Sequence, residues 1–200
     1  MKPLSLALLG LIAAASLGIV SGATVSFSSG MSFTTFQAAD GSPLNKGYLH
    51  AGYYTGDPVG LNSADLRDNF VPWASFGTDS GAAGFFGNAD FPVTPVAGAG
   101  GSQIYLVVTD SADPAVASQI AVFTNQTDPD WEYPATDLGF TPSVSMDDII
   151  SPASGAIILA GAESTQYGGP SIQLNSVIPE PSSSLLAALG GLGLLARRRR

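Results

Sequence analysis

The C-terminal segment of the chain joins three unlike stretches in a fixed order. A short polar stretch contains Pro179, Glu180 and Pro181, and the twelve residues 185–196 that follow are all Leu, Ala or Gly. Four arginines come next: Arg197, Arg198, Arg199 and Arg200. Proline fixes φ and lacks an N–H donor, so the first stretch predicts an extended, exposed backbone. A helix that is apolar all round favours a membrane or a buried site over the protein surface.

The apolar stretch is short for a membrane span. Twelve helical residues reach about 18 Å, whereas the hydrocarbon core is roughly 30 Å thick. The preceding serines, the long arginine stems and local thinning of the bilayer can close this gap. We therefore expect a weak, temporary anchor with its arginines on the cytoplasmic side and the rest of the chain outside. The alternative is a C-terminal helix that packs against the domain.

The order of Pro179-Glu180-Pro181, a short Leu/Gly/Ala helix and an arginine cluster resembles the PEP-CTERM sorting signal of exported Gram-negative proteins. The resemblance covers residues 178–200. It implies that a membrane protease of the exosortase type recognises the Pro-Glu-Pro segment and removes the apolar tail. Such a protease can also transfer the protein to another surface component. Proteins of this kind are often linked to exopolysaccharide and biofilm matrix.

The N-terminal segment has the pattern of a signal peptide. Lys2 gives a minimal positive start, and residues 4–20 are apolar except for two serines. Ser21, Gly22 and Ala23 then provide small residues at the spacing that a signal peptidase needs. We expect residues 1–23 to be a signal peptide that is cleaved after Ala23. A retained N-terminal transmembrane helix is the alternative.

Removing both ends leaves residues 24–178, enough for one domain with a sizeable core. This part has two cations, Lys46 and Arg67, and fifteen of the sixteen acids, so its net charge is 2 − 15 = −13. Such a surface repels nucleic acid and anionic lipid, which excludes both as partners of the domain. The chain has no cysteine and therefore no disulfide.

Short extended segments separated by Gly, Pro, Asn and Asp dominate residues 24–178. We expect an all-β fold, a β-sandwich or jelly-roll-like single domain, flanked by an N-terminal signal helix and a C-terminal apolar helix. Residues 24–28 and 31–36 read as half-buried strands that could form a hairpin. Residues 103–110 and 119–125 read as an antiparallel pair in the centre of the sheet. The remaining predicted strands are 47–54, 156–160 and 171–175.

Three segments carry more specific signals. A short helix is predicted around 64–68, capped by Asn62 or Ser63. Residues 91–96 contain two prolines, which restricts them to an edge strand or a loop. Residues 141–150 fit a strand or a short helix that begins at Ser145.

The central segment adds a second, diffuse resemblance. Residues 47–54, 104–108 and 122–125 look like strands in the uncharacterised domains of other proteins with such sorting tails. Those domains have no assigned activity, so this resemblance implies no function.

Catalytic signals are weak. His50 is the single histidine and lies inside a predicted strand, and no Gly-x-Ser-x-Gly segment accompanies it. A buried or strand-surface histidine is therefore favoured over a catalytic base. Two facing carboxylates for glycoside hydrolysis are a remote alternative, since fifteen acids always include some pair. We expect the protein not to be an enzyme.

Ligand binding is a stronger alternative. Three local groups of acids could supply oxygen ligands to calcium, although none has the spacing of a known calcium loop. The groups are Asp65 with Asp68, Asp128 with Asp130 and Glu132, and Asp147 with Asp148. Five aromatic residues could stack on sugar rings or fill the core. They are Tyr53, Tyr54, Trp73, Trp131 and Tyr133.

The sequence therefore predicts an exported, non-catalytic surface or extracellular-matrix protein whose tail is processed by an exosortase-like protease. The second hypothesis is a carbohydrate-binding or adhesive module, with calcium as its one candidate cofactor. Trp131 and Tyr133 are its candidate ligand contacts, and exopolysaccharide is the candidate partner.

Overall fold

The structure is a computed structural model that describes residues 23–28, 35–77, 83–87, 89–93, 100–133, 143–150, 154–165 and 169–177. The predicted signal helix and the predicted tail helix lie outside these residues. Among the described residues, no helix has the length and apolar character needed to cross a membrane.

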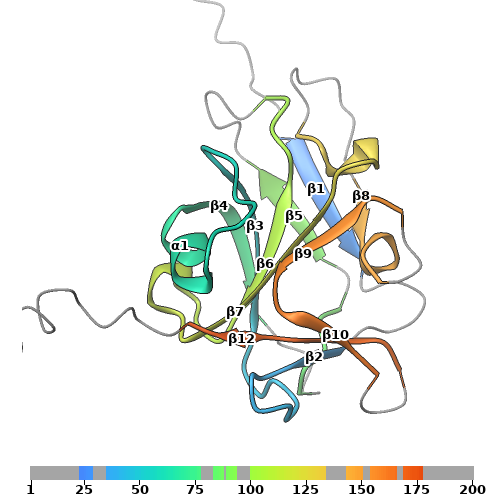
Figure 1. The fold of residues 1–200 in the computed structure, drawn as a ribbon. Helices are drawn as coiled ribbons and strands as arrows, with labels where there is room; N and C mark the ends of the chain where they lie inside the picture. Colours follow the sequence, from blue (N-terminus) through green and yellow to red (C-terminus); the bar gives the residue numbers. More distant parts are fainter. Residues whose placement is uncertain are drawn as a thin grey trace, which may run out of the picture.

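The described part of the chain is built from three β-sheets and one short α-helix (Figure 1). The large sheet has the order β12-β7-β6-β3-β4, with β9 also paired to β7. Its strands are β3 (Tyr48–Tyr54), β4 (Phe70–Gly77), β6 (Tyr105–Thr109), β7 (Gln119–Asn125), β9 (Ala156–Ala160) and β12 (Asn175–Ser176). One small sheet consists of β5 (Ala89–Val93), β1 (Ala23–Ser28) and β8 (Ser143–Ser145). The other consists of β10 (Ala162–Ser164), β11 (Ser171–Gln173) and β2 (Thr35–Gln37). The all-β prediction is confirmed.

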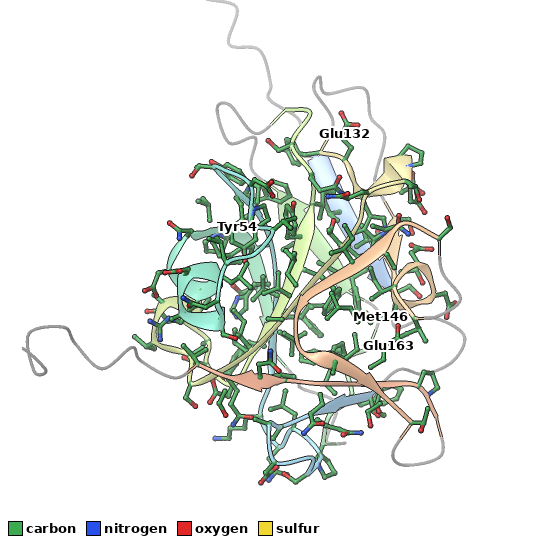
Figure 2. All side chains as sticks on the ribbon, in the orientation of Figure 1. Tyr54, Glu132, Met146 and Glu163 are labelled. Carbon is green, nitrogen blue, oxygen red and sulfur yellow. The ribbon has the colours of Figure 1, made fainter. Side chains whose placement is uncertain are left out.

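Both faces of the central strands of the large sheet are buried, because their residues alternate between two hydrophobic clusters. On β6, Leu106 and Val108 belong to the main cluster, whereas Tyr105 and Val107 belong to the second. The main cluster lies between the large sheet and the two small ones. The second cluster includes Leu66 of helix α1 (Ser63–Asp68) and is covered by that helix. Figure 2 shows this division, with Tyr54 on the α1 side and Met146 on the β8 side.

Helix α1 forms where its cap predicts it. The Asn62 side chain accepts hydrogen bonds from the backbone N–H groups of Ala64 and Asp65, each 2.9 Å long. Leu66 is fully buried, which fixes the helix on the sheet. The predicted helix is confirmed, with Asn62 as its cap.

The predicted central pair is also confirmed. β6 and β7 are antiparallel, with Leu106 opposite Phe123. Asp110 closes the connection between them, since its Oδ1 accepts from the N–H groups of Ser118 at 2.9 Å and Gln119 at 3.1 Å. The short helix η1 (Pro114–Val116) lies within this connection.

The predicted hairpin of residues 24–28 and 31–36 is wrong. β1 pairs with β5 and β8, and β2 pairs with β11 in another sheet. Residues 31–34 lie outside the described part. The alternation of Val25 and Phe27 toward the core identifies a half-buried strand, but it carries no information about the partner strand.

The structure decides between the alternatives for two segments. β5 lies at the edge of its sheet, as its proline predicts. Residues 143–150 combine both alternatives, because β8 is followed at once by the short helix η3 (Met146–Asp148). Ser145 caps η3 through a hydrogen bond from the Asp147 N–H.

Gly52 allows β3 and β4 to approach closely. The register between the two strands shifts between Ala51 and Gly52. A Cβ atom on Gly52 would overlap the Val71 carbonyl oxygen and the Phe70 ring. We expect Gly52→Ala to lower the free energy of unfolding by about 2 kcal/mol in urea titrations, because β4 would have to shift. Gly56→Ala is the matched control, since a Cβ there meets no atom within 4 Å. Equal stability of the two variants would contradict this account.

Candidate functional site

His50 lies in the core of the large sheet. Its Nε2 is 2.8 Å from Thr109 Oγ1, and its Nδ1 is 2.7 Å from Ser75 Oγ. The Thr109 hydroxyl donates to the Ser111 carbonyl at 2.7 Å, so it accepts from His50 Nε2–H. Nδ1 is then the acceptor for the Ser75 hydroxyl.

This arrangement pairs a histidine with an exposed serine, but the third group is Thr109 rather than a carboxylate. Burial lowers the pKa of His50 to about 4, against smaller opposing effects of the Ser111 backbone and the Asp113 charge. A neutral imidazole of this kind is a weak base at neutral pH. The contacts join β4, β3 and β6, as expected for a core histidine.

Trp131 and Tyr133 are buried, with 0% and 4% of their surface exposed. Trp131 ends the short helix η2 (Pro129–Trp131), and its Nε1 donates to Asp148 Oδ2 at 3.1 Å. The Tyr133 ring packs against Trp73 with ring centres 4.7 Å apart. In this structure neither ring is open to a sugar, so both match the core-packing alternative.

A row of aromatic rings leads outward from Tyr133. Trp73 on β4 is half-buried and also stacks on half-buried Tyr53 of β3, with ring centres 5.7 Å apart and planes 26° apart. β4 is the edge strand of the large sheet. Tyr53 and Trp73 are therefore better placed than Trp131 and Tyr133 to meet a ligand.

A hollow of about 420 Å³ lies where η2 and η3 meet the end of β7. Asp128, Asp147 and Asp148 line it together with Asn125, Thr127, Pro129 and Ser154. Members of two of the predicted acidic groups thus meet here, Asp128 from one and Asp147 with Asp148 from the other. Asp65 and Asp68 do not, since they lie on α1 at the other face of the large sheet, where Asp68 pairs with Arg67 at 2.7 Å.

Asn125 organises the walls of this hollow. Its Nδ2 donates to the carbonyl oxygens of Asp148 at 2.8 Å and Ser154 at 3.0 Å. Its Oδ1 accepts from the backbone N–H groups of Thr127 and Asp128. A buried side chain thereby fixes three separate segments. The sequence predicts Asn125 only as the last residue of a strand, and the turn residues that follow it are the one signal of its capping role.

The acids around the hollow repel one another. Burial raises the pKa of Asp130, and the charges of Asp128 and Asp148 raise it further. Across the described residues, however, no three His, Asp or Glu side chains converge on a point where a metal ion could bind. The hollow is therefore negative and polar.

The described part of the chain ends beside η1. β12 pairs with β7 through Asn175 opposite Ile120 and Ser176 opposite Gln119. The next residue, Val177, is the last one described; it is 6% exposed, and its N–H donates to the Ser118 carbonyl at 2.8 Å. Figure 1 shows the end of β12 beside the η1 loop, below α1.

At the other end, β1 begins at Ala23, which pairs with Val93. The predicted cleavage after Ala23 would therefore leave Thr24 as the first residue of this strand. The cleavage site itself stays a prediction. Pro179, Glu180, Pro181 and the four arginines lie outside the described residues.

Comparison with known proteins identifies the tail. No curated protein and no solved structure gives a significant match to the chain. Residues 177–200 match the family model of the PEP-CTERM protein-sorting motif. The matched segment starts at Val177, where the described domain ends. The chain therefore carries a PEP-CTERM sorting signal and is an exported protein that an exosortase sorts to the cell envelope of a Gram-negative bacterium.

Proposed function

We propose that this protein is a non-catalytic component of the cell surface or extracellular matrix. Its signal peptide is removed after Ala23, and its C-terminal tail holds it briefly in the inner membrane until exosortase cleaves the tail. The observation that carries this proposal is the sorting motif at residues 177–200, directly behind an all-β domain.

Two features of the domain support a non-catalytic role. The single histidine is buried and held between strands by Ser75 and Thr109. Cysteine is absent from the sequence. The net charge of −13 for residues 24–178, from two cations and fifteen acids, supports a soluble extracellular domain rather than one that binds nucleic acid.

Mass spectrometry of the protein exported by a host with an exosortase tests the processing. We expect a mature chain that starts at Thr24 and has lost Arg197 to Arg200. A variant with Pro179→Ala and Glu180→Ala should keep its tail, because the recognised segment is altered. Its matched control is Ser182→Ala, next to the motif. Intact arginines on all mature wild-type copies would refute the proposal.

Carbohydrate binding is the second candidate, and the stacked, half-buried Tyr53 and Trp73 favour it. Aromatic side chains on an edge strand can offer an apolar face to a sugar ring. The polar hollow lined by Asp128, Asp147 and Asp148 is the place where calcium could assist. Exopolysaccharide is the ligand class that this candidate implies.

A glycan array on residues 24–178, run with and without calcium, tests this candidate. If it is right, Trp73→Ala removes glycan binding, whereas Trp73→Phe keeps part of it. Calcium should raise the melting temperature of the wild type but not of Asp128→Asn. An array without signal in either condition would dismiss sugar binding, and an unchanged melting temperature would dismiss calcium.

A further inference from the structure

The sorting motif begins almost at the surface of the folded domain. Val177 is docked, and only Ile178 separates it from Pro179. Consecutive Cα atoms are about 3.8 Å apart, so the Cα of Pro179 lies within about 8 Å of that of Val177 in any conformation. The first residue of the Pro-Glu-Pro segment therefore stays close to Val177 while Val177 remains packed in the domain.

Residues 175–177 are engaged by the domain on several sides. Asn175 and Ser176 are paired with β7, and the Val177 N–H is bonded to Ser118. The Val177 side chain packs in the second cluster, which includes Tyr54 and Leu66. A protease binds its substrate as an extended segment of several residues, often through the backbone. The residues that precede the motif are unavailable for such binding in the docked state.

Release of β12 and Val177 from β7 is a small structural change. β12 contributes two registered residues, and both are exposed. Leu174, just before β12, is 2% exposed in the main cluster, and its N–H donates to the Gln37 carbonyl at 2.9 Å. Opening can therefore stop at Leu174 and leave the rest of the domain folded.

We propose that undocking of β12 and Val177 from β7 gates the recognition of the sorting motif. Exosortase acts on a minor open state in which residues 175–177 are released from β7. The rate of tail removal then follows the population of that state. This inference rests on processing by exosortase, and it adds that the domain controls the rate.

A disulfide across β12 and β7 tests the gate. Ser176 and Gln119 are opposite each other, and the bond from Val177 to Ser118 makes them a non-hydrogen-bonded pair. Such pairs have Cα atoms roughly 4.5 Å apart, within disulfide range. The chain has no other cysteine to interfere. In the oxidising periplasm, the double variant Gln119→Cys with Ser176→Cys should form a disulfide that holds β12 on β7. We call this variant locked.

We expect pulse-chase analysis of the full chain in an exosortase host to show tail removal roughly tenfold slower in the locked variant. A membrane-permeable reductant, or either cysteine alone, should restore the wild-type rate. Val177→Ala should accelerate removal roughly tenfold, because it weakens docking. A flexible Gly/Ser spacer inserted between Val177 and Ile178 should also accelerate it.

The combination of lock and spacer separates gating from a defect in folding or export. The locked chain with the spacer should be processed at least as fast as the wild type, because its motif is free while β12 stays docked. Equal rates for locked and reduced chains would overturn the gate. A spacer that slows processing would also overturn it and would indicate that exosortase binds the η1 rim. A wild-type chain that never loses its tail would instead overturn the processing itself.

Discussion

Trp131→Ala is expected to lower the free energy of unfolding by about 3–5 kcal/mol, a large part of the stability of an ordinary domain. Trp131 is fully buried in the main cluster, so truncation leaves a cavity. The same change removes the hydrogen bond from Nε1 to Asp148. Urea unfolding of residues 24–178, followed by circular dichroism, measures the loss.

Trp131→Phe is the matched control. Phenylalanine keeps most of the apolar volume but cannot donate to Asp148, whose Oδ2 would retain the Ser145 N–H at 3.0 Å. We expect a loss of about 1–2 kcal/mol for this variant. If Trp131→Ala unfolds within 1 kcal/mol of the wild type, Trp131 is not a core residue, and its assignment as a ligand contact becomes viable again.

The sequence alone does not distinguish a buried Trp131 from one that contacts a ligand. Trp131 and Tyr133 lie in a loop segment rich in acids, which is typical both of a binding loop and of a turn closing over a core. Three hydrogen bonds hold Trp131 inward: its Nε1 donates to Asp148, and its carbonyl accepts from the Ile104 N–H and from Gln103 Nε2. Contacts over such separations are invisible to local patterns.

The fold likewise has local features that the sequence predicts and long-range pairings that it does not. Strand positions and α1 could be predicted, because alternation and helix capping act over a few residues. The pairing could not: β1 joins β8, a strand more than a hundred residues later, in parallel. Predicting a hairpin for residues 24–36 assumed that neighbouring strands pair, which holds often but not here.

The presence of the sorting signal could be predicted, because its specificity lies in a short linear order of residues rather than in a folded surface. The packing of Val177 against the domain could not be predicted from the sequence. The sequence marks Val177 only as an apolar residue before a proline-rich segment, and its packing beneath α1 depends on how β12 reaches β7.

Acidification is expected to destabilise the domain between about pH 6.5 and pH 4 through His50. Burial lowers the pKa of His50 to about 4 in the folded state, from the ordinary histidine value of 6.5. Above pH 6.5 the ring is neutral in both states. As the pH falls below this value, His50 becomes protonated in the unfolded chain but stays neutral in the folded chain. The free energy of unfolding therefore decreases.

The full effect is about 3 kcal/mol, since each pKa unit corresponds to about 1.4 kcal/mol, and it levels off below pH 4. Asp40 acts at lower pH, because hydrogen bonds from Ser42 lower its pKa below 3.8, whereas Asp130, with its raised pKa, contributes equally to both proteins compared below. Melting curves from pH 7.5 to pH 3.5 on the wild type and on His50→Gln measure the difference. The variant, whatever its absolute stability, should lack the slope between pH 6.5 and pH 4. Parallel curves for the two proteins would show that His50 is not the group responsible and that its ring accepts a proton inside the fold.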